Sequence, residues 1–171
     1  GLVVLVLVVW LVTMYNGLVR KRQTCHESWS DIDSELKRRH DLIPNLISSV
    51  KGYAAHEKRL MEEVTALRQE AQQAAAGGAS AARGSLETRL GAGVNTLIAT
   101  AEAYPDLKAN TNFLQLQEEL TSTENKIGFA RQHYNRTVNQ FNEATKVFPS
   151  NLIAGTFGFR EMTFFELDPG E

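Results

Sequence analysis

The stretch that decides the fold runs from Ile32 to Ala71 and reads IDSELKRRHDLIPNLISSVKGYAAHEKRLMEEVTALRQEA. Alternating steps of four and three residues pass through twelve positions, of which ten are apolar or aromatic: Ile32, Leu36, Ile43, Leu46, Val50, Tyr53, Leu60, Val64, Leu67 and Ala71. This spacing is the repeat of about 3.5 residues that is typical of left-handed helical bundles. We therefore predict an all-α chain in which this stripe is core, with one helix continuing to the glycines that begin at Gly77.

The first nineteen residues carry no charge and open with GLVVLVLVVWLV. As a helix they would span roughly 28 Å, close to the thickness of the hydrocarbon core of a bilayer. Neither a basic leading segment nor a small-x-small cleavage site accompanies them, so we expect a retained transmembrane anchor rather than a signal peptide. The residues expected to contact lipid are Leu2, Val3, Leu5, Leu7, Trp10 and Leu11.

Three basic residues, Arg20, Lys21 and Arg22, follow the apolar segment directly. The positive-inside rule then places the rest of the chain in the cytoplasm. The same residues have two interpretations: contact with anionic lipid headgroups, worth about 1 kcal/mol each, or a topology signal alone.

The sequence contains no recognisable catalytic or cofactor site. The net charge of −2 excludes a general attraction to nucleic acid. Cys25 is the single cysteine and cannot form an internal disulfide. The four histidines lack partners at metal-ligand spacing, and no nucleophile or nucleotide motif is found. We expect no enzyme activity, no cofactor and no metal.

Beyond the anchor (residues 1–19), we predict an elongated antiparallel bundle over residues 20–148. Pro44 predicts a kink in its first helix, giving three long helices, or four if the helix breaks there. We predict a second helix from Leu86 to Tyr104, capped by Ser85 and ended by Pro105. The last helix is expected to start between residues 106 and 112 and to end at the Phe148-Pro149 pair.

Two charged residues, Arg39 and Glu57, interrupt the apolar stripe. A buried unpaired charge is costly, so one interpretation is a polar site between helices. The interpretation that we favour from the sequence places both at the edge of the core, with only their apolar stems buried. In the second helix, Gly91 and Gly93 either weaken the helix or let another helix approach closely.

The C-terminal segment, residues 149–171, is unusually apolar and contains SNLIAGTFGFREMTFFEL. Its large apolar residues would form an adhesive patch if all remained in water. Two interpretations stay open: the segment folds back on the bundle, or it docks on a neighbouring subunit, a partner or the membrane surface. The candidate interface residues are Leu152, Ile153, Phe157, Phe159, Phe164 and Phe165.

Several segments, in order along almost the whole chain, resemble the LemA family: YNGLV at residues 15–19, WSDID at 29–33, LKRRHDLIPNLISSVKGYAAHE at 36–57, EAYPDLKAN at 102–110, YN at 134–135, FN at 141–142 and FPSNLIAG at 148–155. The loop near Gly77 and the surroundings of Cys25 depart from the pattern. The resemblance implies a bacterial α-helical protein of the inner membrane, in a family with a branch of magnetosome membrane proteins. Some members of the family carry a lipoprotein signal, which would place their bundle on the periplasmic side. The resemblance implies no catalytic residues.

The combined expectation is a single-pass scaffold at the bacterial inner membrane, with lipid as one partner and a homo-oligomer as the assembled state. The alternative function is an adaptor for a membrane-bound protein, such as a protease or a factor for secretion or envelope maintenance.

Overall fold

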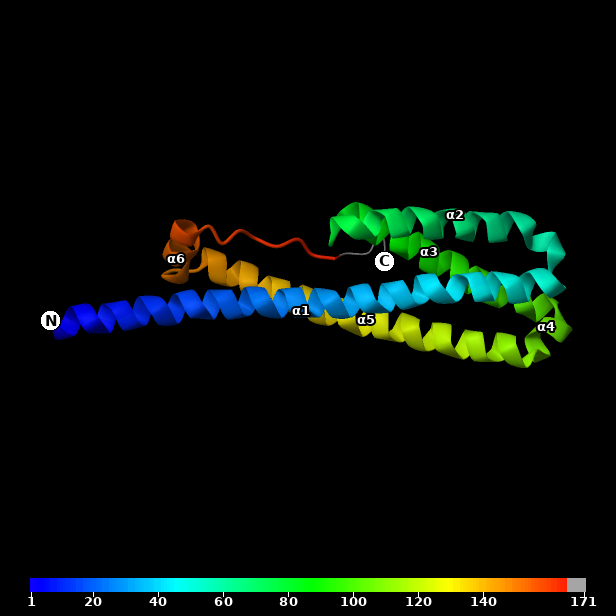
Figure 1. Ribbon diagram of the computed structural model, residues 1–171, viewed down its shortest axis with the longest axis horizontal. Helices are drawn as coiled ribbons and strands as arrows, with labels where there is room; N and C mark the ends of the chain where they lie inside the picture. The colour runs from blue at the N-terminus through cyan, green and yellow to red at the C-terminus, as the bar shows by residue number, and fades with distance from the viewer. Residues whose placement is uncertain (166–171) are drawn as a thin grey trace.

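The computed structural model describes residues 1–165, and this part of the chain is α-helical without strands, which confirms the predicted fold class. The molecule is elongated, with its long helices lying side by side along one axis (Figure 1). The helices are α1 (Leu2–Tyr53), α2 (Lys58–Ala74), α3 (Ala81–Thr100), α4 (Pro105–Ala109), α5 (Thr111–Lys146) and α6 (Ser150–Phe157), with single 3-10 turns at Ala55–Glu57, Ala75–Gly77 and Ala101–Ala103.

The first helix passes through Pro44 without ending, but it does not continue to Gly77. It ends at Tyr53, where Ala54 adopts φ −126° and ψ 55°, and α2 then runs back along it (Figure 1). The prediction of one helix that continues to the glycines at Gly77 was therefore wrong, and the break that gives four long helices lies at Ala54 rather than at Pro44. The apolar stripe is present on both sides of the turn, because α1 and α2 each bury one face in the same core.

The structure also corrects the start of the second predicted helix. Ser80, not Ser85, caps α3: its side chain accepts a hydrogen bond of 3.1 Å from the backbone N–H of Arg83. Gly78 precedes it with φ +69°, a left-handed conformation that favours glycine. The start of α5 at Thr111 lies within the predicted window, and Asn110 caps it through the N–H of Phe113.

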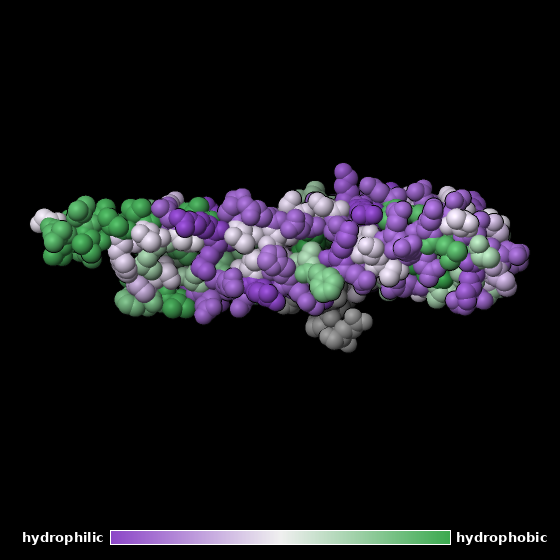
Figure 2. Space-filling model, turned by 90° about the horizontal axis from the view of Figure 1, so that it is seen from below, coloured by the Kyte–Doolittle hydropathy of each residue, from purple (hydrophilic) through white to green (hydrophobic). Residues whose placement is uncertain are grey.

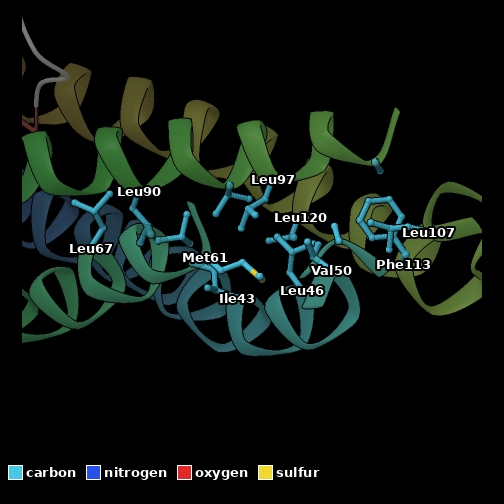
Figure 3. Packing of buried hydrophobic residues seen from close by; sticks show 14 of the residues in the cluster. Ile43, Leu46, Val50, Met61, Leu67, Leu90, Leu97, Leu107, Phe113 and Leu120 are labelled. Atoms are coloured by element: carbon cyan, nitrogen blue, oxygen red, sulfur yellow. The ribbon is translucent and has the colours of Figure 1, made fainter. Parts of the chain in front are cut away.

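Two hydrophobic clusters lie along the rod. The distal cluster joins all four long helices and includes Ile43, Leu46, Met61, Leu90, Leu97 and Leu120 (Figure 3). The proximal cluster, nearer the N-terminus, lies between α1 and α5 and includes Ile32, Leu36, Tyr134, Phe141, Ile153 and Phe165. In this half the C-terminal segment packs on α1 and α5, and only the loop at the end of the α2–α3 hairpin reaches the cluster, through Ala79 (Figure 1).

Candidate functional site

The N-terminal part of α1 projects from the bundle as an exposed apolar helix. Leu2 is 76% exposed, and the other predicted anchor residues, Val3, Leu5, Leu7, Trp10 and Leu11, are exposed as well. Among residues 1–165, α1 is the helix long and apolar enough to cross a membrane. Such a surface would be unfavourable in water, whereas lipid matches it and the helix pairs its own backbone groups.

The three basic residues after the anchor, Arg20, Lys21 and Arg22, are also exposed on α1. One of them additionally contacts the C-terminal segment: the Arg22 guanidinium carbon lies 4.9 Å from the centre of the Phe159 ring. A cation at this distance from an aromatic face is attracted to it. The juxtamembrane region and the C-terminal segment therefore form one structural unit.

The structure separates the six candidate interface residues into two groups. Ile153, Phe159 and Phe165 are buried in the proximal cluster and Phe164 is half-buried, so these four do not form an exposed contact surface. Their apolar surface is covered by α1 and α5 of the same chain, as in the interpretation in which the segment folds back on the bundle. Their role as an interface stays a prediction. Leu152 and Phe157 remain exposed on α6.

Two asparagines of α5 hold the extended part of the C-terminal segment. Asn142 donates to the carbonyl of Met162 (3.0 Å) and accepts from its N–H (2.8 Å). Asn135 makes the same pair of bonds with Phe165, at 3.0 and 2.9 Å. The Tyr134 hydroxyl donates to the carbonyl of Thr163 at 2.7 Å. These side chains satisfy backbone groups that an extended segment beside a helix would otherwise leave unpaired.

A charged cluster is buried between α1, α3 and α5. Arg39 is 3% exposed, and its guanidinium donates to the carboxylate and the backbone carbonyl of Glu87 and, at 2.9 Å, to Oε1 of Glu124. Arg39 therefore belongs to a polar site between helices, and the favoured placement at the core edge was wrong for it. Glu57, the other charge in the stripe, lies half-buried in the turn after α1, where the Tyr104 hydroxyl is 3.5 Å away.

His40 completes this cluster, with Nε2 2.9 Å from Oε1 of Glu87. Burial raises the pKa of Glu87, but the hydrogen bond from His40 and the positive charge of Arg39 outweigh it and hold that pKa below its ordinary value. Arg68 of α2 donates to the His40 carbonyl at 2.6 Å. The ionised Glu87 carboxylate thus joins α3 to α1, Glu124 joins α5 to Arg39, and Arg68 adds α2 through the His40 carbonyl.

Gly91 makes room for the Arg39 guanidinium. A Cβ at this position would lie 2.9 Å from Nη1 of Arg39, closer than real Cβ contacts allow. A Cβ at Gly93 would lie 2.9 Å from Cγ2 of Val64. Both glycines thus permit close helix approach, one of the two roles expected from the sequence. A cavity of about 260 Å³ lies beside the cluster, next to Asn95 and Arg131.

A second buried cation, Arg83, fixes the α2–α3 loop to α1. Its guanidinium donates to Oδ1 of Asp33 at 2.6 Å and to the Ala75 carbonyl at 3.3 Å, and it lies 5.1 Å from the Trp29 ring. Arg83 itself is buried, while Asp33 reaches solvent. The sequence did not predict this contact, because Arg83 lies between the two helices predicted to end at Gly77 and to start at Leu86.

Two kinds of reactive side chain can be placed in the structure, the potential metal ligands and the thiol of Cys25. No group of three or more histidine, cysteine or acidic side chains that could hold a metal ion occurs among residues 1–165. Cys25 is buried, and this burial raises the pKa of its thiol despite the hydrogen bond with Thr137 and the nearby Lys21. A thiol in this environment is a poor nucleophile.

Comparison with known proteins identifies the chain. The model of the LemA family matches residues 28–171, which include the whole charged cluster and the asparagines that hold the C-terminal segment. The chain belongs to the LemA family.

Three relatives extend this result. Magnetosome protein MamQ of Magnetospirillum gryphiswaldense is 23% identical over 192 aligned residues, covering 97% of this chain and 71% of that protein. Protein LemA of Metamycoplasma hominis is 24% identical over 151 residues, covering 88% and 68%. Magnetosome protein MamQ 2 of Paramagnetospirillum magneticum is 22% identical over 182 residues, covering 93% and 67%. Together with the exposed apolar part of α1, these similarities indicate a membrane-associated LemA protein and fit a single-pass topology.

Proposed function

We propose that this LemA protein is a non-enzymatic scaffold that holds a helical rod on a membrane and self-associates there. One observation carries the proposal: α1 is a single helix of 52 residues that contains both the exposed apolar anchor and the buried stripe of the bundle. At about 1.5 Å per residue it is roughly 78 Å long, so the part beyond the anchor extends well away from the bilayer. The interior along it is filled by packed apolar side chains and paired charges, an arrangement suited to rigidity.

Self-association is supported by the apolar residues that the folded chain leaves exposed. On α5, Phe129 is 72% exposed and Leu114 is also exposed, beside a shallow groove of polar side chains. Anchoring in one membrane confines the rods to a plane and aligns their axes, which raises their effective concentration for lateral contact. A second copy is then the partner that meets this face most often.

Purification in a mild detergent, followed by mass measurement with light scattering, tests this proposal. We expect a defined multiple of the 19.0 kDa chain, and we expect Phe129→Ser to shift the protein towards monomer. The matched control is His133→Ser, one helical turn away on the exposed surface of α5. A monomer before mutation contradicts the proposal, and a monomer that captures another membrane protein would support the adaptor function. Deletion of the residues after Pro149 is a poor test, because it would also expose the proximal cluster.

We further propose that the bundle lies in the cytoplasm, on the basis of the exposed cluster Arg20, Lys21 and Arg22. Cys25 is fully buried and cannot report sidedness, so the test uses Gln23→Cys in a Cys25→Ala background. In bacterial cells, a membrane-impermeant maleimide should label this position only after the inner membrane is permeabilised. Labelling of intact cells would place the bundle outside the cytoplasm.

A further inference from the structure

We propose that α6 enters the interfacial layer of the bilayer beside α1, so that the chain contacts lipid with two helices. The ligand of α6 is phospholipid: its acyl chains meet the apolar side chains and its headgroups meet the flanking cations. The inference rests on the proposed anchoring of α1 in a membrane, and it adds a second lipid-binding surface from the opposite end of the sequence.

The position of α6 along α1 carries the argument. A groove of about 570 Å³ is lined by Leu11, Val12 and Tyr15 of α1 together with residues of α6. The ring centroids of Tyr15 and Phe157 lie 4.9 Å apart, so α6 is fixed at this level of the anchor. Because the apolar segment continues to Val19, this level is four to eight residues inside it, or roughly 6 to 12 Å at about 1.5 Å per residue.

That depth is close to the value of about 5 to 10 Å at which interfacial helices bury their apolar face. If residues 1–19 are embedded in lipid, the packing of α6 on Tyr15 brings α6 to the boundary between headgroups and acyl chains. In the alternative, α6 stays in water. The part of the apolar segment from Leu11 to Val19 would then have to stay in water with it.

The chemistry of α6 and its flanks fits this boundary. Phe148 is 74% exposed and Phe157 is 61% exposed, and Leu152 and Val147 are exposed beside them. Residues 147–159 contain no charge. Arg160 follows at one end and is exposed, whereas Lys146 at the other end pairs with Glu161 at 2.8 Å. Hydrophobic residues gather at the N-terminal end of the molecule, where the anchor and α6 lie (Figure 2). An apolar face with exposed cations nearby, here Arg160, Arg20 and Lys21, is typical of segments that bind an anionic membrane surface.

Lipid is favoured over a second copy of the chain because the exposed face of α6 continues the exposed face of the anchor. The two share the groove between Leu11 and Phe157, and lipid that surrounds one helix at this level also reaches the other. The cations Arg20 and Lys21 are exposed on α1 just beyond this level, where they would meet the headgroups.

Spin labels on the full chain in vesicles of phosphatidylethanolamine and phosphatidylglycerol test the inference. Single cysteines replace Leu152 and Phe157 in a Cys25→Ala background. Leu7→Cys supplies the lipid reference, and Glu70→Cys on the exposed surface of α2 supplies the water reference. Collision of each label with oxygen, which concentrates in lipid, is compared with collision with a nickel chelate, which stays in water. We expect both α6 labels to show the high oxygen-to-nickel ratio of the Leu7 label, severalfold above that of the Glu70 label.

Three results would overturn the inference. Ratios at both α6 positions equal to that at Glu70, with Leu7 still in lipid, would place α6 in water while leaving the anchor intact. Low collision with both reagents would mean that protein covers α6, as in contact with a second copy. A water-like ratio at Leu7 would refute the anchoring of α1 and the inference together. Equal far-UV circular dichroism of all variants checks that each label leaves the fold unchanged.

Discussion

Arg39 and Glu87 form an ion pair between α1 and α3, in which both side chains are almost completely buried. Burying either charge alone would cost several kcal/mol, so the two residues depend on each other. The carboxylate also pairs with His40, and the guanidinium also pairs with Glu124. Three helices are thus held in one register by four side chains at the level where the α2–α3 hairpin approaches the C-terminal segment.

Replacing Glu87 should destabilise the protein strongly. Removal of one partner from a buried ion pair costs about 3 to 5 kcal/mol, and the remaining bond between Arg39 and Glu124 puts Glu87→Gln near the lower end. A loss of about 3 kcal/mol lowers Tm by roughly 6 to 12 °C in a chain of this size, measurable by circular dichroism in mild detergent. The control is Glu62→Gln, because Glu62 and Lys58 form an exposed pair, and its Tm should change little. Similar Tm values for the two variants would contradict a stabilising role for the cluster.

The stability that Glu87 contributes should depend on pH. The pKa of Glu87 is lower in the folded chain than its usual value of 4.5, so the unfolded state binds the proton more readily. This stabilisation is therefore present above the usual pKa and is lost as the pH falls through the folded pKa. The difference in Tm between the original chain and Glu87→Gln should be largest near neutral pH and should shrink at acid pH. A difference independent of pH would mean that shape rather than charge matters at this position.

Two glycines should respond in opposite directions to the same substitution. Gly91→Ala would place a methyl group 2.9 Å from Nη1 of Arg39, and it should lower Tm because that guanidinium is held by Glu87 and Glu124. Gly128→Ala meets no atom within 4 Å, and in the middle of α5 it should stabilise the helix by about 0.5 to 1 kcal/mol. Thermal unfolding of both variants in parallel gives the comparison. A rise in Tm for Gly91→Ala would show that the Arg39 side chain can move without loss of stability.

Asn142→Ala should release the C-terminal segment from α5. The variant loses two hydrogen bonds to Met162, and at about 1 kcal/mol each the opening equilibrium should rise roughly 30-fold. Trypsin cleavage after the exposed Arg160 should accelerate accordingly, since cleavage follows the population of the open state. Asn139→Ala is the control, because Asn139 is exposed on the same helix. Equal cleavage rates for the two variants would mean that apolar packing alone retains the segment.

The sequence predicted the helical class, the exposed anchor and the position of α5, because these depend on local composition and on residues that end helices, such as Pro105. It did not predict the reversal at Ala54. A stripe such as Val50, Val64 and Leu67 shows which face of a helix is buried but is the same for one long helix and for a hairpin.

The contacts of the charged cluster could not be predicted from the sequence either. Arg39 was recognised as a charge in an apolar stripe, but Glu87 lies 48 residues away, and only the arrangement of the helices brings them together. For the C-terminal segment a signal was available. Asn135 and Asn142 are seven residues apart and therefore lie on one face of α5, at the spacing needed to hold a segment that runs beside the helix.

The continuity of α1 between the anchor and the bundle has a mechanical consequence. If α1 crosses from lipid into the rod as proposed, any tilt of the anchor would be transmitted along the helix to the turn at Ala54. A bilayer thinner than the apolar segment favours such tilting. The orientation of the rod, and so the height of its outer end above the lipid, would then depend on the thickness of the membrane.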